Sequence, residues 1–278
     1  MESHWSVERH DSIEPLAREW DEFADRLAAP PWLRPAWFSA WWAAFGRGML
    51  RLFAVRDERR LVGVVPVAKA RLGRVSSPTN WHTPEFGLLA EPDATGRLAR
   101  VLFADRPECV SLAFVDVSSP AMAGVRQAAG EKGYRCLSRS LERSPYIIID
   151  GDWELYEAGR SRRLLSELSR RRRRLADEGK FSFECVDGSE RLDELLDEGF
   201  RVEAAGWKGA RHSAIMSKVE TDRFYRAVAR WAAEHGWLRL AFLRLDGRPF
   251  AFDFCVEHDG VHYLLKTGFD SAYSRFAP

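Results

Sequence analysis

The sequence predicts an α/β protein made of two domains or of one duplicated unit. Its 278 residues exceed what a single core usually organises. Around the middle of the chain, helical and strand-like patterns alternate, which is typical of α/β folds. Residues 50–70 and 238–258 also share one layout, a strand, a charged turn and a longer apolar strand. This repetition favours a tandem duplication with a boundary near Ser144, and we expect domains at residues 1–144 and 145–278.

The composition indicates a globular protein whose charge points to no particular partner. Hydrophobic residues make up 46% of the chain and charged residues 30%. The 42 basic and 41 acidic side chains give a formal net charge of +1. No global field therefore favours nucleic acid, a membrane surface or an acidic substrate, and any electrostatic targeting must be local.

Cysteine usage and the amino terminus predict a cytoplasmic protein. The four cysteines, Cys109, Cys136, Cys185 and Cys255, are far apart and form no C-x-x-C motif. We expect them to be reduced thiols buried in the core. The first residues have no apolar signal region, and no run approaches the roughly 18 apolar residues of a spanning helix. Membrane insertion is therefore not expected.

The first half is predicted to begin with a short strand and two helices, followed by strands and then by alternating elements. The expected order is a strand at 5–10, helices at 13–27 and 36–45, strands at 50–57 and 61–71, a loop, a helix from 94, a strand at 110–117, a helix at 120–132 and a strand at 134–141. Four tryptophans lie close together around the second helix. They predict either core packing or an aromatic wall for a ligand, and they are Trp32, Trp37, Trp41 and Trp42.

The second half is predicted to open with a strand and to end in a three-stranded meander. The expected order is a strand at 145–150, a basic helical stretch at 153–179, a strand at 181–187, a helix at 190–205, a loop at 206–214, a helix at 220–235 and the meander from 238. Both turns of the meander are Asp-Gly pairs, Asp246-Gly247 and Asp259-Gly260. Such pairs between alternating apolar residues are the strongest short-range signal for two-residue hairpin loops.

The hairpin register places the two faces of the meander. The expected core face consists of Phe250, Phe252, Phe254 and Val256 with Val261, Tyr263 and Leu265. On the other face Asp253 lies opposite Lys266, so that each charge offsets the cost of the other. This pair is either an ordinary cross-strand ion pair, which contributes about 0.2 to 1 kcal/mol, or a charged pair at the floor of a substrate cleft. A β-bulge in either strand would change the register.

The helical stretch at 153–179 is intensely basic, with eight arginines between residues 160 and 174. Five consecutive arginines spread around the whole helix, so a solvated helix is one interpretation. The other is a site for an anion, either an anionic acceptor or the phosphates of CoA, formed by Arg170, Arg171, Arg173 and Arg174. RNA is less favoured, because no aromatic residues are interleaved in the arginine run to stack on bases.

Several segments in one order resemble a known family. They are "PPWLRPAWFSAWWAAFG", "RRLVGVVPVA", "EAAGWKGARHSA", "LRLAFLRLDGRPFAF" and "YLLKTGFDSAYSRFAP". Together they resemble GNAT-like acyltransferases of the CelD type, associated with cellulose and exopolysaccharide biosynthesis and related to the FemABX peptidyltransferases. The resemblance covers nearly the whole chain. It implies tandem GNAT-like units around a mixed, largely antiparallel sheet, and acetyl-CoA or another acyl-CoA as acyl donor.

The resemblance also bears on the carboxyl end of the chain. In that family a helix opening at S-P-G offers backbone N–H groups to the pyrophosphate of the cofactor. Here the sequence ends at Phe276, Ala277 and Pro278. We therefore expect the second unit to be truncated at its carboxyl end.

Acyl transfer needs a proton acceptor for the amine and a donor for the oxyanion, but no nucleophilic residue. We expect Asp253 or Glu203 as general base and Lys266 as the group that binds the carbonyl oxygen or an anionic part of the substrate. For substrate binding, the resemblance favours Trp207 and Lys208. Asp270 matches an acidic motif position, and Tyr263 is either an acid or a packing residue. The spacing of histidines and cysteines predicts no metal site.

The leading functional prediction is a cytoplasmic acyl-CoA-dependent N-acyltransferase. Its acceptor would be an amino group of a small molecule or of a cell-surface polysaccharide precursor. One alternative is a FemABX-type peptidyltransferase that uses aminoacyl-tRNA, and another is a non-catalytic binding or assembly module. Because an exposed edge of the meander favours association, we also expect a homodimer.

Overall fold

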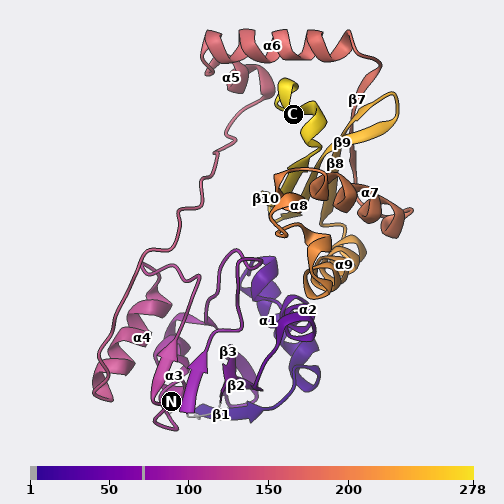
Figure 1. Ribbon diagram of the computed structural model, residues 1–278. Helices are drawn as coiled ribbons and strands as arrows, with labels where there is room; N and C mark the ends of the chain where they lie inside the picture. Colours follow the sequence, from indigo (N-terminus) through magenta and orange to yellow (C-terminus); the bar gives the residue numbers. More distant parts are fainter. Residues whose placement is uncertain (1–4, 71–72) are drawn as a thin grey trace. The chain divides into compact units, whose positions relative to one another are not determined.

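The computed structural model describes residues 5–70 and 73–278, and the chain divides into two compact units (Figure 1). Unit 1 comprises Met1–Arg139, Arg223–Trp231 and His258–Val261, and unit 2 comprises Ser140–Asp222, Ala232–Glu257 and His262–Pro278. Each unit combines helices with a sheet in which most strand pairs are antiparallel, so the predicted mixed α/β class is confirmed. Domains at 1–144 and 145–278 stay a prediction.

Unit 1 is built on a sheet with the strand order β1-β2-β3-β4-β6, and β5 pairs with β3; these are the six strands of this sheet within the described residues. Strands β4 and β6 are parallel, whereas the other pairs are antiparallel. The elements are β1 (Trp5–His10), η1 (Glu14–Leu16), α1 (Ala17–Arg26), η2 (Pro31–Leu33), α2 (Pro35–Phe45), β2 (Met49–Asp57), β3 (Arg60–Lys69), β4 (Arg74–Ser76), β5 (Leu89–Ala90), η4 (Pro92–Ala94), α3 (Thr95–Val101), β6 (Cys109–Ser111) and α4 (Pro120–Glu131).

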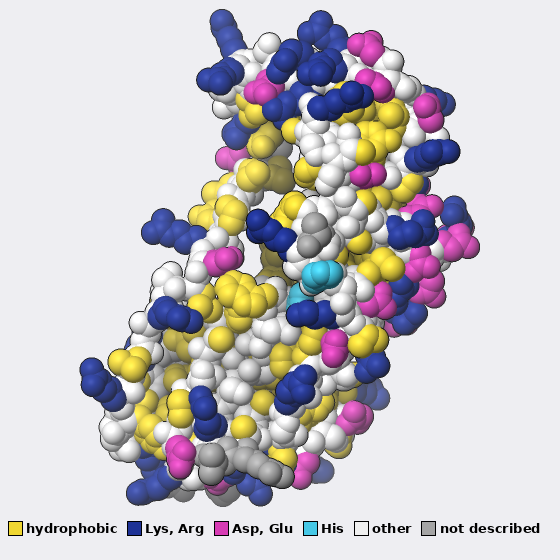
Figure 2. Space-filling view, viewed as in Figure 1, with side chains coloured by type: hydrophobic (Ala, Val, Ile, Leu, Met, Phe, Trp, Pro, Cys, Tyr) yellow, Lys and Arg dark blue, Asp and Glu magenta, His cyan; other side chains and the backbone are white. Residues whose placement is uncertain are grey.

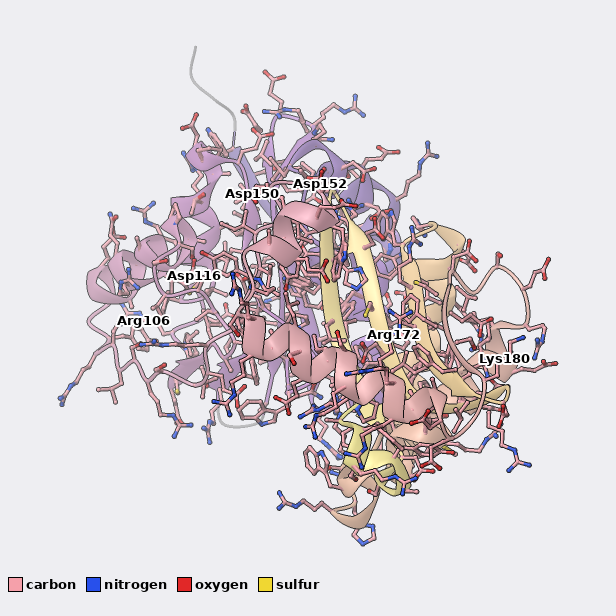
Figure 3. All side chains as sticks on the ribbon, turned by 90° about the horizontal axis from the view of Figure 1, so that it is seen from above. Arg106, Asp116, Asp150, Asp152, Arg172 and Lys180 are labelled. Atoms are coloured by element: carbon pink, nitrogen blue, oxygen red, sulfur yellow. The ribbon has the colours of Figure 1, made fainter. Side chains whose placement is uncertain are left out.

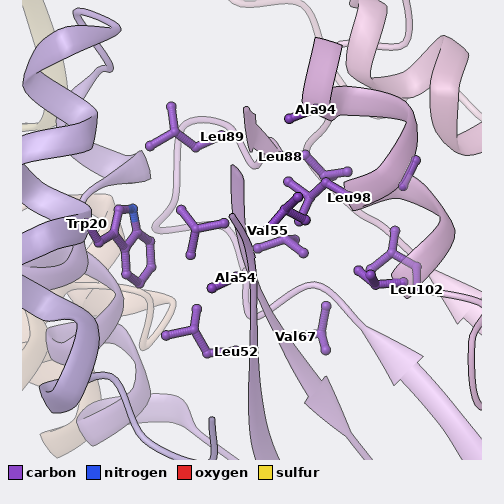
Figure 4. Packing of buried hydrophobic residues seen from close by; sticks show 14 of the residues in the cluster. Trp20, Leu52, Ala54, Val55, Val67, Leu88, Leu89, Ala94, Leu98 and Leu102 are labelled. Carbon is purple, nitrogen blue, oxygen red and sulfur yellow. The ribbon is translucent and has the colours of Figure 1, made fainter. Parts of the chain in front are cut away.

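The core of unit 1 lies on both sides of β3, in which residues 61–67 are all buried. Figure 4 shows Trp20 of α1 on one side of the strands and Leu98 of α3 on the other. A near-continuous apolar run is what a strand covered on both faces requires. Of the tryptophans around α2, Trp42 packs against this core cluster. Trp32, Trp37 and Trp41 lie outside it but are buried, at 7%, 1% and 7% exposed, which favours the packing interpretation.

Unit 2 contains a second sheet with the strand order β10-β9-β8-β7, so β10 and β7 are its two edges among the strands that the structure describes. The remaining elements are α5 (Trp153–Ala158), α6 (Arg162–Ala176), β7 (Phe181–Val186), α7 (Leu192–Ala204), α8 (Trp207–Ala210), η5 (Ile215–Ser217), α9 (Val219–Glu234), β8 (Leu238–Leu245), β9 (Arg248–His258), β10 (Val261–Phe269) and η6 (Ser271–Phe276). The middle of α9 and the tip of the second hairpin are counted with unit 1.

The meander forms as predicted, and both Asp-Gly pairs are its turns. Asp246 and Gly247 have φ of 49° and 79°, and Asp259 and Gly260 have φ of 49° and 72°. Positive φ at both central residues is the type I′ geometry, which matches the twist of the flanking strands. The second position of each turn favours glycine, since a side chain there would be strained.

A bulge in the first hairpin changes the predicted core face. The register of β8 and β9 shifts between Leu243 and Arg244. Consequently Phe250 stacks on Tyr273 at 4.7 Å and joins a cluster with Leu175, Ala251 and Phe276. Phe252 instead packs against Phe200 and Phe242, at 6.3 and 5.1 Å between ring centroids. A bulge can re-aim side chains in this way. Phe250 is buried as predicted, at 1% exposed, but its cluster does not include Phe252.

Several predictions from the sequence are wrong. Residues 134–141 and 145–150 form no strand, and Tyr146, Ile147, Ile148 and Ile149 are between 64% and 83% exposed. Val261 was expected in the core and is 45% exposed, because β10 is an edge strand. Of the four cysteines only Cys255 is buried, and the other three are exposed. Local β propensity therefore did not decide which segments found a strand partner.

Candidate active site

The end of α7 and the end of β10 approach each other closely in unit 2. A Cβ atom at Gly268 of β10 would lie 2.7 Å from the Cα of Glu203 on α7. A Cβ at Gly206, just after α7, would lie 2.6 Å from the carbonyl oxygen of Phe269. Glycine within a strand often marks such a close backbone approach. Gly268 is not among the predicted site residues, although a glycine inside an apolar strand is a signal that the sequence contains.

This approach buries the carboxylate of Glu203, which is 0% exposed. Its Oε2 accepts a hydrogen bond from the backbone N–H of Ile215 at 2.7 Å. Its Oε1 lies 3.4 Å from Nζ of Lys208 and makes no hydrogen bond within the described residues. Nζ of Lys208 also donates to the carbonyl oxygen of Thr267. One buried carboxylate thus connects α7, α8, β10 and the segment at η5.

Lys266 of β10 belongs to the same electrostatic environment. Burial lowers its pKa below the usual value of 10.5, and the charge of Lys208 lowers it further, whereas Glu203 partly opposes this. Burial and a like charge both disfavour the protonated form of a lysine. Titratable groups with such perturbed pKa values concentrate at functional sites. We call Glu203, Lys208 and Lys266 the buried cluster.

The lowered pKa of Lys266 predicts that its contribution to stability rises with pH. Between the lowered pKa and 10.5 the unfolded chain binds more protons at this residue than the folded chain, so stability increases with pH there. Below that interval Lys266 is protonated in both states, and the free-energy cost of burying its charge is fully present. We expect the free energy of unfolding of wild type minus that of Lys266→Met, from urea denaturation, to be lowest below the lowered pKa and to rise as the pH approaches 10.5. An equal rise for Lys180→Met, which changes an exposed lysine, would contradict the assignment.

Asp270 follows β10 directly and makes contacts that shape the chain. Its backbone N–H donates to the carbonyl oxygen of Phe250 at 2.8 Å. Its Oδ1 accepts from the N–H of Ala272 at 2.9 Å and caps η6. The substrate-binding role of Asp270 stays a prediction, and these contacts orient the end of the strand.

Trp207 presents its indole ring beside two cationic groups. The side chain is 55% exposed, and Nζ of Lys208 and Cζ of Arg211 lie 5.9 and 5.4 Å from the ring centroid. The segment predicted as a loop here contains the one-turn helix α8. An exposed aromatic ring next to the buried cluster suits contact with a ligand.

The remaining predicted residues of the meander are half-buried. Asp253 of β9 lies opposite Ala241 of β8. Burial raises the pKa of the nearby Cys255 thiol to about 12, and the charge of Asp253 contributes to this. Tyr263 is half-buried on β10. The structure therefore brings Glu203, Lys208 and Lys266 together, and the cross-strand pair of Asp253 with Lys266 stays a prediction.

The predicted anion-binding arginines lie on α6. Arg170, Arg173 and Arg174 are exposed, whereas Arg171 is half-buried and pairs with Glu167 at 2.5 Å. Elsewhere in unit 2 an open groove runs along β7 and the turn after it, lined among others by Glu184, Asp187, Arg191 and Arg239. Its lining includes none of the predicted site residues. In the described ranges, no group of three or more His, Cys, Asp or Glu side chains has an arrangement that could hold a metal ion.

The fold and the buried cluster together define an α/β protein with a charged site at one end of a helix–sheet unit. Residues 160–278 match the family model Acetyltransf_6, described as acetyltransferase (GNAT) domain. This match contains α6, α7, the whole meander and every predicted site residue. A more specific assignment to the CelD or FemABX type stays a prediction.

A solved structure described as a tandem GNAT protein from the clavulanic acid biosynthesis pathway, without AcCoA, aligns with a TM-score of 0.39 and 10% identity. The alignment covers 97% of this chain and 80% of that chain. No curated protein matches the sequence.

Proposed function

We propose that this protein transfers an acyl group from an acyl-CoA, in the simplest case acetyl-CoA, to an amino group. The observation that carries the proposal is the match of residues 160–278 to the acetyltransferase (GNAT) domain. All three residues of the buried cluster lie within the matched range. Perturbed titratable groups within a matched catalytic domain are a reasoned starting point for locating a site. Acyl-CoA is a substrate in this proposal.

The reaction places definite demands on the protein. The nitrogen of a neutral amine attacks the thioester carbonyl, so a C–N bond forms and the C–S bond then breaks. The amine loses a proton, and the CoA thiolate leaves with the electron pair and is protonated. In the tetrahedral intermediate the carbonyl oxygen carries a negative charge, which a preorganised donor stabilises.

We assign the donor to Lys266 and a positioning role to Glu203. The cluster contains two lysines and one carboxylate. This excess of lysine over carboxylate would stabilise an oxygen atom that becomes negative in the intermediate. Glu203 is 0% exposed and its Oε2 is engaged by Ile215, so it serves by holding Lys208 rather than by touching the amine. Proton removal then falls to Asp253, the half-buried carboxylate among the two predicted bases.

The acceptor is proposed to contact the surface formed by Trp207 and Lys208. An exposed indole offers an apolar face to a sugar ring or another flat group, and its neighbouring cations favour an acceptor that also carries an anionic group. Asp270 and Tyr263 remain proposed substrate-binding residues on and next to the same strand. A small amine or an amino group of a cell-surface polysaccharide precursor is the proposed acceptor class, in a cytoplasmic setting.

The proposal is tested first by calorimetric titration of the 278-residue chain with acetyl-CoA. We expect saturable binding, followed by acyl transfer to members of an amino-sugar panel. Lys266→Met is expected to lower kcat/KM by about tenfold or more, equivalent to about 1.4 kcal/mol of transition-state stabilisation. Lys180→Met provides the matched control and should leave kcat/KM unchanged.

Other outcomes of these assays would replace the proposal. A folded chain that shows no saturable acetyl-CoA binding would favour a non-catalytic binding or assembly module. Transfer from aminoacyl-tRNA that ribonuclease abolishes would favour a FemABX-type peptidyltransferase.

The proposed homodimer rests on the edge strand β10. Within the described residues the sheet order ends at β10, and Leu264 on this strand is 56% exposed. Unpaired strand edges favour association. A dimer mass at micromolar concentration is expected in light scattering, and a monomer mass would contradict it.

A further inference from the structure

Helix α6 concentrates positive charge in an otherwise balanced protein. Eight arginines lie between residues 160 and 174, with Glu167 as the single carboxylate up to residue 176. Setting these nine residues aside leaves 34 basic and 40 acidic side chains in the rest of the chain. The net charge of +1 is therefore the sum of a strongly basic segment at residues 160–176 and an acidic rest of the chain.

Most of this charge is not neutralised by the protein itself. Glu167 pairs with Arg171 at 2.5 Å and lies 3.9 Å from Arg170. Throughout the part of the chain that the structure describes, no carboxylate lies within ion-pair distance of four other arginines, which are Arg162, Arg163, Arg173 and Arg174. Exposed guanidinium groups without a carboxylate partner are available to an external anion.

Helix α6 is held to unit 2 at its carboxyl end. Leu175 is buried in the cluster with Phe250, Ala251 and Phe276, and Glu178 pairs with Arg275 at 2.7 Å. Towards the amino end the exposure increases, and residues 161–164 are all exposed. Figure 3 looks onto α6 and shows its side chains, Arg172 among them, projecting from the helix. In Figure 2 basic side chains crowd the end of the view where α6 lies.

Exposed apolar side chains accompany the arginines in the same segment. Leu164 and Leu168, one turn apart on α6, are 44% and 50% exposed. On α5, Trp153 and Leu155 are 66% and 63% exposed. Large apolar groups in this number beside a basic helix indicate an interaction surface rather than a solvated face.

We propose that the α5–α6 segment, residues 153–176, binds the surface of bilayers that contain anionic phospholipids. Guanidinium groups bind lipid phosphates, and leucine and tryptophan side chains enter the boundary between headgroups and acyl chains. The segment holds eight arginines against three carboxylates, Glu154, Glu157 and Glu167, so its charge complements an anionic leaflet.

The exposed apolar residues favour a lipid surface over other polyanions. A nucleic acid would pair with the arginines through its phosphates but would leave Leu164 and Leu168 in water. A small anion would engage only a fraction of a helix about 22 Å long. Only the lipid boundary offers phosphates and an apolar phase side by side.

This binding is peripheral and needs no spanning element. Among the described residues, no helix combines the length and apolarity needed to cross a bilayer. Peripheral adsorption driven by arginine weakens as ionic strength rises, because salt screens the attraction. It would bring the enzyme of the proposed function to a membrane surface, although the inference does not rest on that function.

The test is sedimentation of the full chain with vesicles of phosphatidylcholine containing about one third phosphatidylglycerol, and with phosphatidylcholine alone. We expect binding to the anionic vesicles only, lost between about 0.05 and about 0.5 M salt. Replacing Arg162, Arg163, Arg173 and Arg174 by glutamine should weaken binding about tenfold or more. The double variant Leu164→Gln/Leu168→Gln should weaken it several-fold.

A matched control replaces four exposed arginines elsewhere, Arg47, Arg59, Arg135 and Arg139, by glutamine and should leave vesicle binding within about twofold. Equal losses in the control and in the α6 variant would overturn the proposal, because net charge alone would then explain binding. Tighter binding to duplex RNA than to vesicles at equal phosphate concentration, unaffected by the leucine changes, would assign the segment to nucleic acid and also overturn it.

Discussion

Replacing Glu203 by leucine is expected to lower the free energy of unfolding by about 3 kcal/mol or more. The leucine removes the acceptor for the backbone N–H of Ile215, which is buried, and leaves that donor without its hydrogen bond. It also removes the carboxylate 3.4 Å from Nζ of Lys208, whose side chain is only 16% exposed. Both losses destabilise the folded state, and urea denaturation followed by circular dichroism measures them together.

Two variants on the same helix separate these losses. Glu203→Gln keeps an acceptor for Ile215 but not the charge, so we expect a smaller loss than with leucine. Glu194→Gln changes an exposed side chain on α7 whose ion pair with Arg191 is solvent-screened, and it should alter stability by less than about 0.5 kcal/mol. If Glu203→Leu were as mild as Glu194→Gln, the buried cluster would have no structural role.

Gly199→Ala is expected to destabilise the protein by about 2 kcal/mol. Gly199 lies inside α7, where helix propensity alone would favour alanine by up to about 1 kcal/mol. However, a Cβ atom there would lie 2.3 to 2.5 Å from ring atoms of Phe252. Phe252 is 1% exposed and packs between Phe200 and Phe242, so its ring has little room to move. Overpacking should therefore outweigh propensity.

The same substitution at Gly130 should change stability in the opposite direction, because it adds a methyl group without overpacking. Gly130 lies in α4, and a Cβ atom there would have nothing within 4 Å. Gly130→Ala should therefore be neutral or stabilise the protein by about 0.5 kcal/mol in thermal or urea unfolding. If both alanines had the same effect, the packing of α7 on β9 would differ from the one described.

Much of the fold follows from local signals in the sequence. The Asp-Gly pairs predicted both turns of the meander, since few other residues adopt positive φ at two successive positions. The helices α2, α7 and α9 lie within two residues of their predicted ends, because their apolar periodicity is strong. By contrast, the apolar run 145–150 reads as a strand but pairs with none, since pairing depends on a distant partner.

The candidate site was predicted as residue types rather than as an arrangement. The residue types at Glu203, Lys208 and Lys266 point to the site, but nothing in the sequence pattern indicates that Lys266 lies near Glu203. The link between α7 and β10 depends on Gly268, whose missing side chain lets the two backbones meet. Contacts between segments more than fifty residues apart produce no periodic pattern from which a single sequence could predict them.

The sequence by itself determined the α/β class, the two hairpin turns, the basic helix and the residue types at the candidate site. These depend on φ preferences, side-chain periodicity and charge, which act over a few residues. Only the tertiary structure decided that Glu203 is buried beside Lys208 and that a bulge turns Phe250 towards Tyr273. It likewise decided that, among the described residues, most arginines of α6 have no carboxylate partner. Burial and pairing are properties of the packed chain, because they depend on which distant segments come into contact.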